Sequence, residues 1–76
     1  MAQVTVPDLG EGISKVQVVA WHTKEGGRVQ KDDDLVELVT DKAVFNVPAP
    51  IDGILHKIEV QAGEEVPVGA LLGFIQ

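Results

Sequence analysis

Residues 25–38 read EGGRVQKDDDLVEL, and residues 62–75 read AGEEVPVGALLGFI. The two segments carry a glycine, a valine and two aliphatic residues at equivalent places, 37 positions apart. The aligned pairs are Gly26 with Gly63, Val29 with Val66, Leu35 with Leu72 and Leu38 with Ile75. A segment that recurs in this way predicts a domain built from two similar halves.

A second pair of segments continues the repeat toward the N-terminus. VTVPDLGEGI at 4–13 aligns with FNVPAPIDGI at 45–54, here with an offset of 41 positions. The change in offset predicts about four extra residues in the first half, between Gly12 and Trp21. Chance matches are expected in a valine-rich chain, but two blocks in the same order favour a true repeat. The aligned pairs are Val6 with Val47, Pro7 with Pro48, Gly12 with Gly53 and Ile13 with Ile54.

Short runs of apolar and β-branched residues alternate with turn-forming residues, which indicates an all-β fold. No stretch of ten or more residues has the 3.6-residue period of an amphipathic helix. We expect strands at residues 4–6, 16–23, 35–39, 44–47, 54–60 and 71–75, with short pieces around Val29 and Val66.

The repeat also predicts how the strands pair. Strand 35–39 should pair with strand 44–47 through the turn at 40–43, and the equivalent pair in the other half joins 71–75 to 4–6. The two chain ends should therefore meet at one end of the molecule, and the turn should lie at the opposite end. Two small antiparallel sheets packed face to face satisfy this arrangement.

Length and charge narrow the functional classes. The chain has 76 residues, enough for one small domain, and a formal net charge of −6. The acidic balance argues against binding to nucleic acid or to an anionic membrane and permits docking to basic patches on a protein partner. No apolar run is long enough to span a membrane, and no signal peptide is visible at the N-terminus. We expect an intracellular protein.

No group of residues in the sequence resembles a catalytic or metal site. His22 and His56 have no partner at ligand spacing, and Ser14, the only serine, has no evident base beside it. The acidic run 32–34 lacks the twelve-residue loop of a calcium site. The chain has no cysteine and hence no disulfide or thiolate ligand. We therefore expect no catalytic residue and no metal site.

Lys42 remains as a candidate functional residue. It lies in the stretch VTDKAVF at 39–45, with no other lysine or arginine within ten positions. A charged residue at a hairpin tip is common, and spacing alone favours this ordinary interpretation. The repeat, however, places Lys42 at the end farthest from the termini, where a tethered domain would present a group.

Five segments taken in order resemble the lipoyl domain of the acyltransferase (E2) component of 2-oxo acid dehydrogenase complexes, over Val4 to Ile75. The resemblance implies a flattened β-barrel, or sandwich, of two four-stranded antiparallel sheets with pseudo-twofold symmetry. The segments are PDLGEGI at 7–13, Trp21, KEGGRV at 24–29, TDKA at 40–43 and GEEVPVGALL at 63–72.

The resemblance also implies a function. Lipoic acid would be joined to Lys42 as an amide by a lipoyl ligase or transferase, with Asp41 and Ala43 flanking it in the turn. The swinging arm would accept an acyl group from a thiamine diphosphate-dependent E1 decarboxylase and deliver it to coenzyme A at the E2 core. The flavoenzyme E3, dihydrolipoamide dehydrogenase, would reoxidise the arm.

The loop before the second strand matches the loop of the family that contributes to recognition by E1. Its residues here are Leu9, Gly10, Glu11, Gly12 and Ile13, and a plain β-connection is the alternative. The chain also departs from the family. Many members have glutamate in place of Val39 and Gly-Asp in place of Gly26–Gly27, differences that bear on which lipoylating enzyme acts.

Two other functions stay open. Biotin carriers share the fold but have Met-Lys-Met where this chain has Asp-Lys-Ala, and an unmodified lipoyl-like domain would serve as an adapter. We expect residues 1–76 to form a single lipoyl domain, the N-terminal part of a longer E2 chain. The expected location is the cytoplasm of a bacterium or archaeon, or the mitochondrial matrix of a eukaryote.

Overall fold

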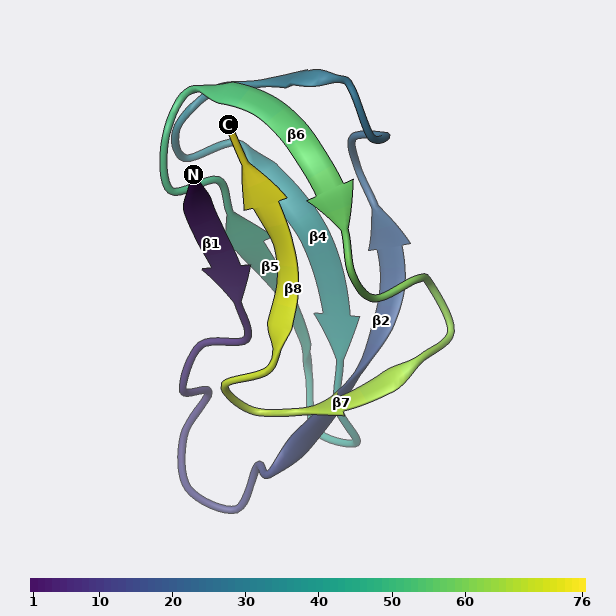
Figure 1. Cartoon of the computed structure of the whole chain (residues 1–76). Helices are drawn as coiled ribbons and strands as arrows, with labels where there is room; N and C mark the ends of the chain where they lie inside the picture. The colour runs from purple at the N-terminus through teal and green to yellow at the C-terminus, as the bar shows by residue number, and fades with distance from the viewer.

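The computed structural model describes residues 1–76 as eight β-strands and no helix (Figure 1). All six longer strands and both short pieces expected from the sequence are present. The differences are at the ends, since β1 begins two residues earlier than expected and β2 and β6 each end two residues earlier. The strands are β1 (Ala2–Thr5), β2 (Lys15–Trp21), β3 (Arg28–Val29), β4 (Asp34–Val39), β5 (Val44–Pro48), β6 (Gly53–Ile58), β7 (Glu65–Pro67) and β8 (Leu71–Ile75).

The strands form two four-stranded sheets. The first sheet has the order β1-β8-β6-β3 and the second the order β5-β4-β2-β7, with every neighbouring pair antiparallel. The sheets pack face to face in a domain of 33 × 20 × 17 Å. The expected sandwich of two four-stranded antiparallel sheets is confirmed.

The two halves of the chain are related by a pseudo-twofold axis. Exchanging β1–β4 with β5–β8 converts the strand order of one sheet into that of the other. Even the irregularities correspond, because β2 bulges at Val19 against β4 and β6 bulges at His56 against β8. These two residues are 37 positions apart, the offset read from the longer repeat.

The predicted alignment of the N-terminal block is wrong by two residues. Val4 pairs with Gly73, and Val47 pairs with Val36. Because Gly73 and Val36 are equivalent, Val4 is the counterpart of Val47, and the offset for β1 and β5 is 43 rather than 41. The shared prolines misled the alignment, since Pro48 ends β5 whereas Pro7 follows β1.

The extra residues of the first half lie in the loop between β1 and β2. Ten positions separate Val6 from Val16, whereas four separate their counterparts Ala49 and Gly53, so the first half has six more residues. The prediction placed about four after Gly12. That position was wrong because Gly12 lies in the loop, with a φ of 82°, whereas Gly53 begins β6.

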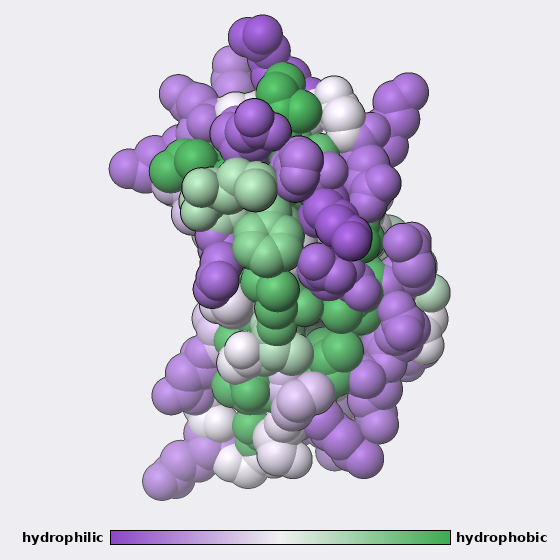
Figure 2. Space-filling model, in the orientation of Figure 1, coloured by the Kyte–Doolittle hydropathy of each residue, from purple (hydrophilic) through white to green (hydrophobic).

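The core lies between the sheets and consists of fourteen buried apolar residues, with no buried polar or charged side chain. Most are valines and leucines that alternate with exposed residues along the strands, as expected for sheets with one face in the core. Trp21 packs half-buried at the margin, where its indole N–H donates to the carbonyl of Val60 at 2.8 Å. Figure 2 shows apolar residues along the middle of one face, with hydrophilic residues at its margins.

Both termini lie at one end of the sandwich, and the turn between β4 and β5 lies at the other (Figure 1). Ala2 and Ile75 are directly paired, so the first and last strands close the first sheet together. This confirms the expected placement of the chain ends relative to the lysine turn. The structure contains no helix long and apolar enough to cross a membrane.

Candidate functional site

Lys42 lies in a four-residue turn at the tip of the β4–β5 hairpin. The strands end with the pair Val39 and Val44, and the backbone N–H of Thr40 donates to the carbonyl of Ala43 at 2.9 Å. Asp41, Lys42 and Ala43 are all exposed. The lysine amine takes part in no ion pair and is open to solvent.

The hydroxyl of Thr40 braces this turn. Its oxygen accepts hydrogen bonds from the backbone N–H groups of Lys42 and Ala43, both at 3.1 Å, and it donates to the carbonyl of Ala43 at 3.2 Å. A hydroxyl at the first turn position can satisfy amides two and three residues ahead. Three hydrogen bonds from one side chain fix the backbone on both sides of the lysine.

Aspartate is also a residue type that can bond local amides in a turn, but here Thr40, and not Asp41, has that role. The carboxylate of Asp41 makes no hydrogen bond. Threonine at the first position of the turn was a signal available in the sequence, since Ser, Thr, Asp and Asn are favoured there.

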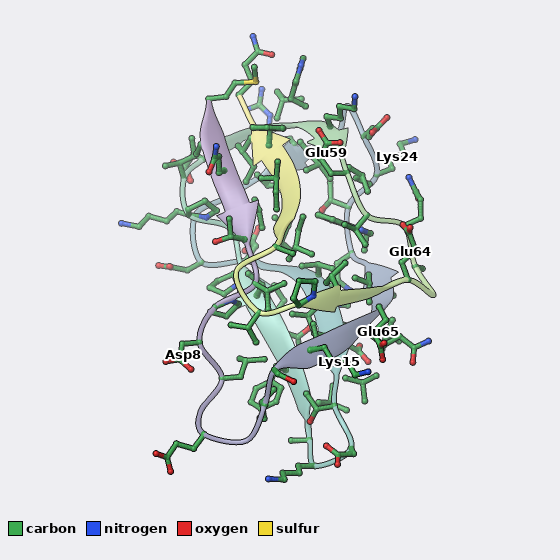
Figure 3. All side chains as sticks on the ribbon, turned by 60° about the horizontal axis from the view of Figure 1, so that its bottom comes forward. Asp8, Lys15, Lys24, Glu59, Glu64 and Glu65 are labelled. Atoms are coloured by element: carbon green, nitrogen blue, oxygen red, sulfur yellow. The ribbon has the colours of Figure 1, made fainter.

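The loop between β1 and β2 lies beside the lysine turn. A Cβ added to Gly12 would be 3.3 Å from the Nζ of Lys42, so the absence of a side chain leaves room for the amine. The loop is ordered by local bonds, including Gly10 N–H to the Asp8 carboxylate at 3.0 Å. Figure 3 labels Asp8 in this loop.

The five predicted recognition residues divide into two groups. Leu9 and Ile13 are partly buried and pack against the core, which anchors the loop. Gly10, Glu11 and Gly12 are exposed between these anchors, and both glycines have positive φ angles, of 110° and 82°. The structure therefore brings the loop and the lysine turn together at one end of the domain.

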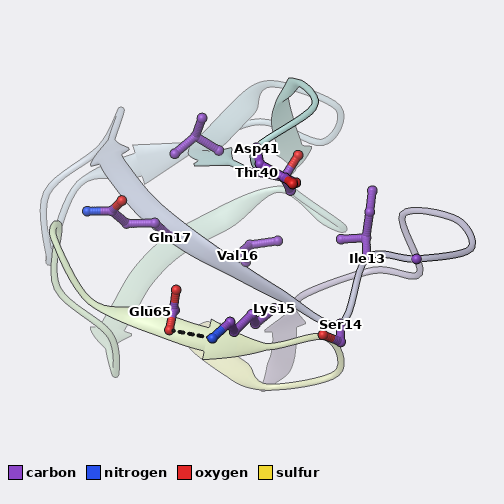
Figure 4. A pocket seen from close by; sticks show the side chains of 10 residues that line it. Ile13, Ser14, Lys15, Val16, Gln17, Thr40, Asp41 and Glu65 are labelled. Carbon is purple, nitrogen blue, oxygen red and sulfur yellow. Dashed lines mark ion pairs between the residues drawn. The ribbon is translucent and has the colours of Figure 1, made fainter.

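A groove of about 520 Å³ separates the loop from the turn (Figure 4). Its walls come from the end of the loop, the start of β2 and the turn. Lys15 and Glu65 form an exposed ion pair at its rim, with Nζ and Oε1 3.4 Å apart. The lining is mainly polar: Gly12 to Gln17, Val39 to Asp41, and Glu65.

The site offers one group with obvious chemistry. The primary amine of Lys42 can form an amide with a carboxylic acid, and its exposure leaves it accessible to a modifying enzyme. No three His, Asp or Glu side chains lie close enough together to hold a metal ion. His22 contacts the side chain of Asn46 at 3.0 Å, with no acid or base beside it.

The fold and the placement of Lys42 can be compared with known proteins. A family model described as "Biotin-requiring enzyme" matches residues 2–75, nearly the whole chain. The chain belongs to the biotin/lipoyl family. A solved lipoyl domain, from the 2-oxoglutarate dehydrogenase complex of Azotobacter vinelandii, superposes with a TM-score of 0.81 at 34% identity, covering 100% of this chain and 96% of that one.

Sequence relatives narrow the assignment to lipoyl domains of E2 components. A dihydrolipoyllysine-residue succinyltransferase component of Buchnera aphidicola is 39% identical over 92% of this chain. A lipoamide acyltransferase component of the branched-chain α-keto acid dehydrogenase complex of Pseudomonas aeruginosa is 39% identical over 91%. This lipoyl domain spans only 17% and 16% of the lengths of these two relatives.

Proposed function

We propose that this lipoyl domain carries acyl groups on a lipoyl arm joined by an amide bond to Lys42. The observation that carries the proposal is an exposed, unpaired lysine on a turn held by three hydrogen bonds, at the end of the domain opposite the termini. A rigid turn and an accessible amine suit a lipoyl arm that must reach several active sites. When bound, the arm supplies a dithiolane that takes up and releases acyl groups.

The residues around Lys42 fit such an arm. Gly12 leaves the space beside the amine free, and Ala43 adds only a methyl group to the turn. Asp41 precedes the attachment point in the turn, and Gly12 of the ordered loop lies beside the amine. In this proposal the chain holds and presents the arm and supplies no acid or base.

The proposed partners follow from the relatives, which belong to 2-oxo acid dehydrogenase complexes. We infer a thiamine diphosphate-dependent E1 as acyl donor, an E2 core as acyl acceptor, E3 for reoxidation, and a lipoyl ligase or transferase for attachment. Residues 1–76 would act as one domain of a longer E2 chain. Because these relatives are bacterial, we propose the cytoplasm as its compartment.

Attachment is tested by intact mass. The chain is incubated with lipoate, ATP and a bacterial lipoate ligase, beside a Lys42→Arg variant with the same charge. We expect one lipoyl increment on the parent and none on the variant. A parent of unchanged mass, with a ligase active on a known lipoyl domain, would reject the proposal.

The biotin alternative is tested in the same way. Biotin and a biotin ligase should leave the mass of the parent unchanged, because the tip here is Asp-Lys-Ala rather than Met-Lys-Met. A biotin increment at Lys42 without a lipoyl increment would make this domain a biotin carrier.

A further inference from the structure

An apolar surface lies on the outer face of the second sheet, next to the lysine turn. Leu38 faces the core, so its neighbour Val39 points outward, and Val44 lies directly opposite on β5. On β2 the polar, exposed Gln17 pairs directly with Val39, and Val19 follows two residues later, diagonally across from Val39. Val44 is 57% exposed and Val19 is 42% exposed. We call Val19, Val39 and Val44 the valine surface.

The fold does not require apolar residues at positions 19 and 39, whereas the counterpart of Val44 is Met1, which is 76% exposed. By the pseudo-twofold, the counterparts of Val19 and Val39 in the first sheet are His56 and Gln76. Both counterparts are polar and exposed, with His56 at the equivalent bulge and Gln76 one residue past the end of β8. Val19 and Val39 are therefore not explained by packing or by strand geometry alone.

The valine surface is continuous with the modification site. Val44 is two residues from Lys42, and Val39 and Val44 are the last pair before the turn. An enzyme that reaches the lysine amine must cover the turn. Val39 also lines the groove between the turn and the loop of residues 7–14, so the valine surface borders the same groove as the loop.

We propose that the valine surface is the docking site of the enzyme that attaches lipoate to Lys42, an inference that rests on the proposed function. Glu37 and Asp41 lie beside the valines, and the domain has a net charge of −6. The complementary partner surface is thus an apolar patch with a basic rim, next to the active site of the ligase. Its activated substrate is a lipoyl adenylate.

The attachment step balances with that substrate. The neutral amine of Lys42 forms a C–N bond to the lipoyl carbonyl, and the bond from that carbonyl to the phosphate oxygen breaks. AMP leaves with the electron pair, and the amine nitrogen loses one proton to solvent. Docking through the valine surface changes how tightly the ligase holds the domain and leaves these bonds unchanged.

The test compares steady-state lipoylation of the parent, Val44→Lys and Ile51→Lys with a lipoate ligase that modifies the parent. Ile51 is a matched control because it is 40% exposed and lies in the short loop before β6. We expect the KM for the domain to rise at least tenfold in Val44→Lys, with kcat within twofold, and to stay unchanged in Ile51→Lys. The more conservative Val44→Thr keeps the branched shape and should change KM less than threefold.

The thermal melting of each variant shows whether its fold is intact. If Val44→Lys melts at a lower temperature than the parent, Val19→Lys is used in its place, because Val19 is exposed and lies away from the turn. Equal KM values for the valine-surface and Ile51 variants would overturn the docking site while leaving lipoylation at Lys42 in place. A parent that sediments as a dimer and becomes monomeric in Val44→Lys would assign the surface to a second copy of this chain instead. A parent that no ligase modifies would overturn both proposals.

Discussion

At the scale of single residues, Thr40 does more for the site than the residues that flank the lysine. It holds two amides and one carbonyl of the turn through one hydroxyl, whereas Asp41 holds none. The side chains of Asp41 and Ala43 are exposed, and neither side chain makes a hydrogen bond within the turn. The stiffness that a modifying enzyme needs in an unmodified hairpin thus comes from the residue before the triplet.

Thr40→Val tests this assignment, because valine keeps the size and β-branching of threonine and removes the hydroxyl. The turn loses its side-chain hydrogen bonds at an exposed site, so we expect about 1 kcal/mol less stability. The kcat/KM for lipoylation should fall about fivefold, since a comparable free energy is needed to restore the turn. Urea unfolding and the mass assay measure the two effects. Thr40→Ser should behave as the parent, and a serine variant as impaired as the valine variant would reject the role of the hydroxyl.

At the scale of strands, hydrophobic periodicity was sufficient to predict where the elements lie. The alternation of valine and leucine with polar residues located all eight strands to within about two residues at their ends. The β1–β5 correspondence was missed because Pro7 and Pro48 match in sequence but not in geometry. The contact of the loop with Lys42 depends on how six extra residues fold back, which periodicity does not determine.

Gly73 on β8 shows a limit of the internal repeat. Its counterpart is Val36, yet a Cβ at position 73 would lie 2.5 Å from the carbonyl oxygen of Lys57 and 3.2 Å from the Trp21 ring. We expect Gly73→Val to lower the free energy of unfolding by about 2–3 kcal/mol, because backbone and a packed ring must both move. Urea unfolding followed by Trp21 fluorescence measures this loss. An unchanged midpoint would contradict the close approach.

At the scale of the whole molecule, the pseudo-twofold makes the chain ends the counterpart of the lysine turn. Gln76 occupies the place of Val39, and Met1 occupies the place of Val44. A second Thr-Asp-Lys-Ala turn should therefore close the ends without strain. The two ends of the domain would then differ in the long loop and in the valine surface, both of which belong to the Lys42 end.

A circular permutant tests this symmetry. Gln76 is joined to Met1 through Thr-Asp-Lys-Ala, new ends are opened between the exposed residues Gln61 and Ala62, and Lys42→Arg removes the original acceptor. We expect a folded protein with a circular dichroism spectrum like that of the parent. The inserted lysine should be lipoylated at least tenfold more slowly, since its surroundings lack both recognition features. A permutant that fails to fold would contradict the equivalence of the two ends.

Acyl transfer to the lipoyl arm on Lys42 is the central step of the proposed function. The lipoylated domain is incubated with thiamine diphosphate and an E1 enzyme specific for pyruvate, 2-oxoglutarate or a branched-chain 2-oxo acid, each with its substrate. The Lys42 peptide is then analysed by fragmentation mass spectrometry. We predict that at least one E1 adds its acyl group to the lipoyl arm on Lys42, and that Lys42→Arg stays unacylated. A lipoylated domain that none of the three enzymes acylates, while each acylates its own lipoyl domain, would contradict the account.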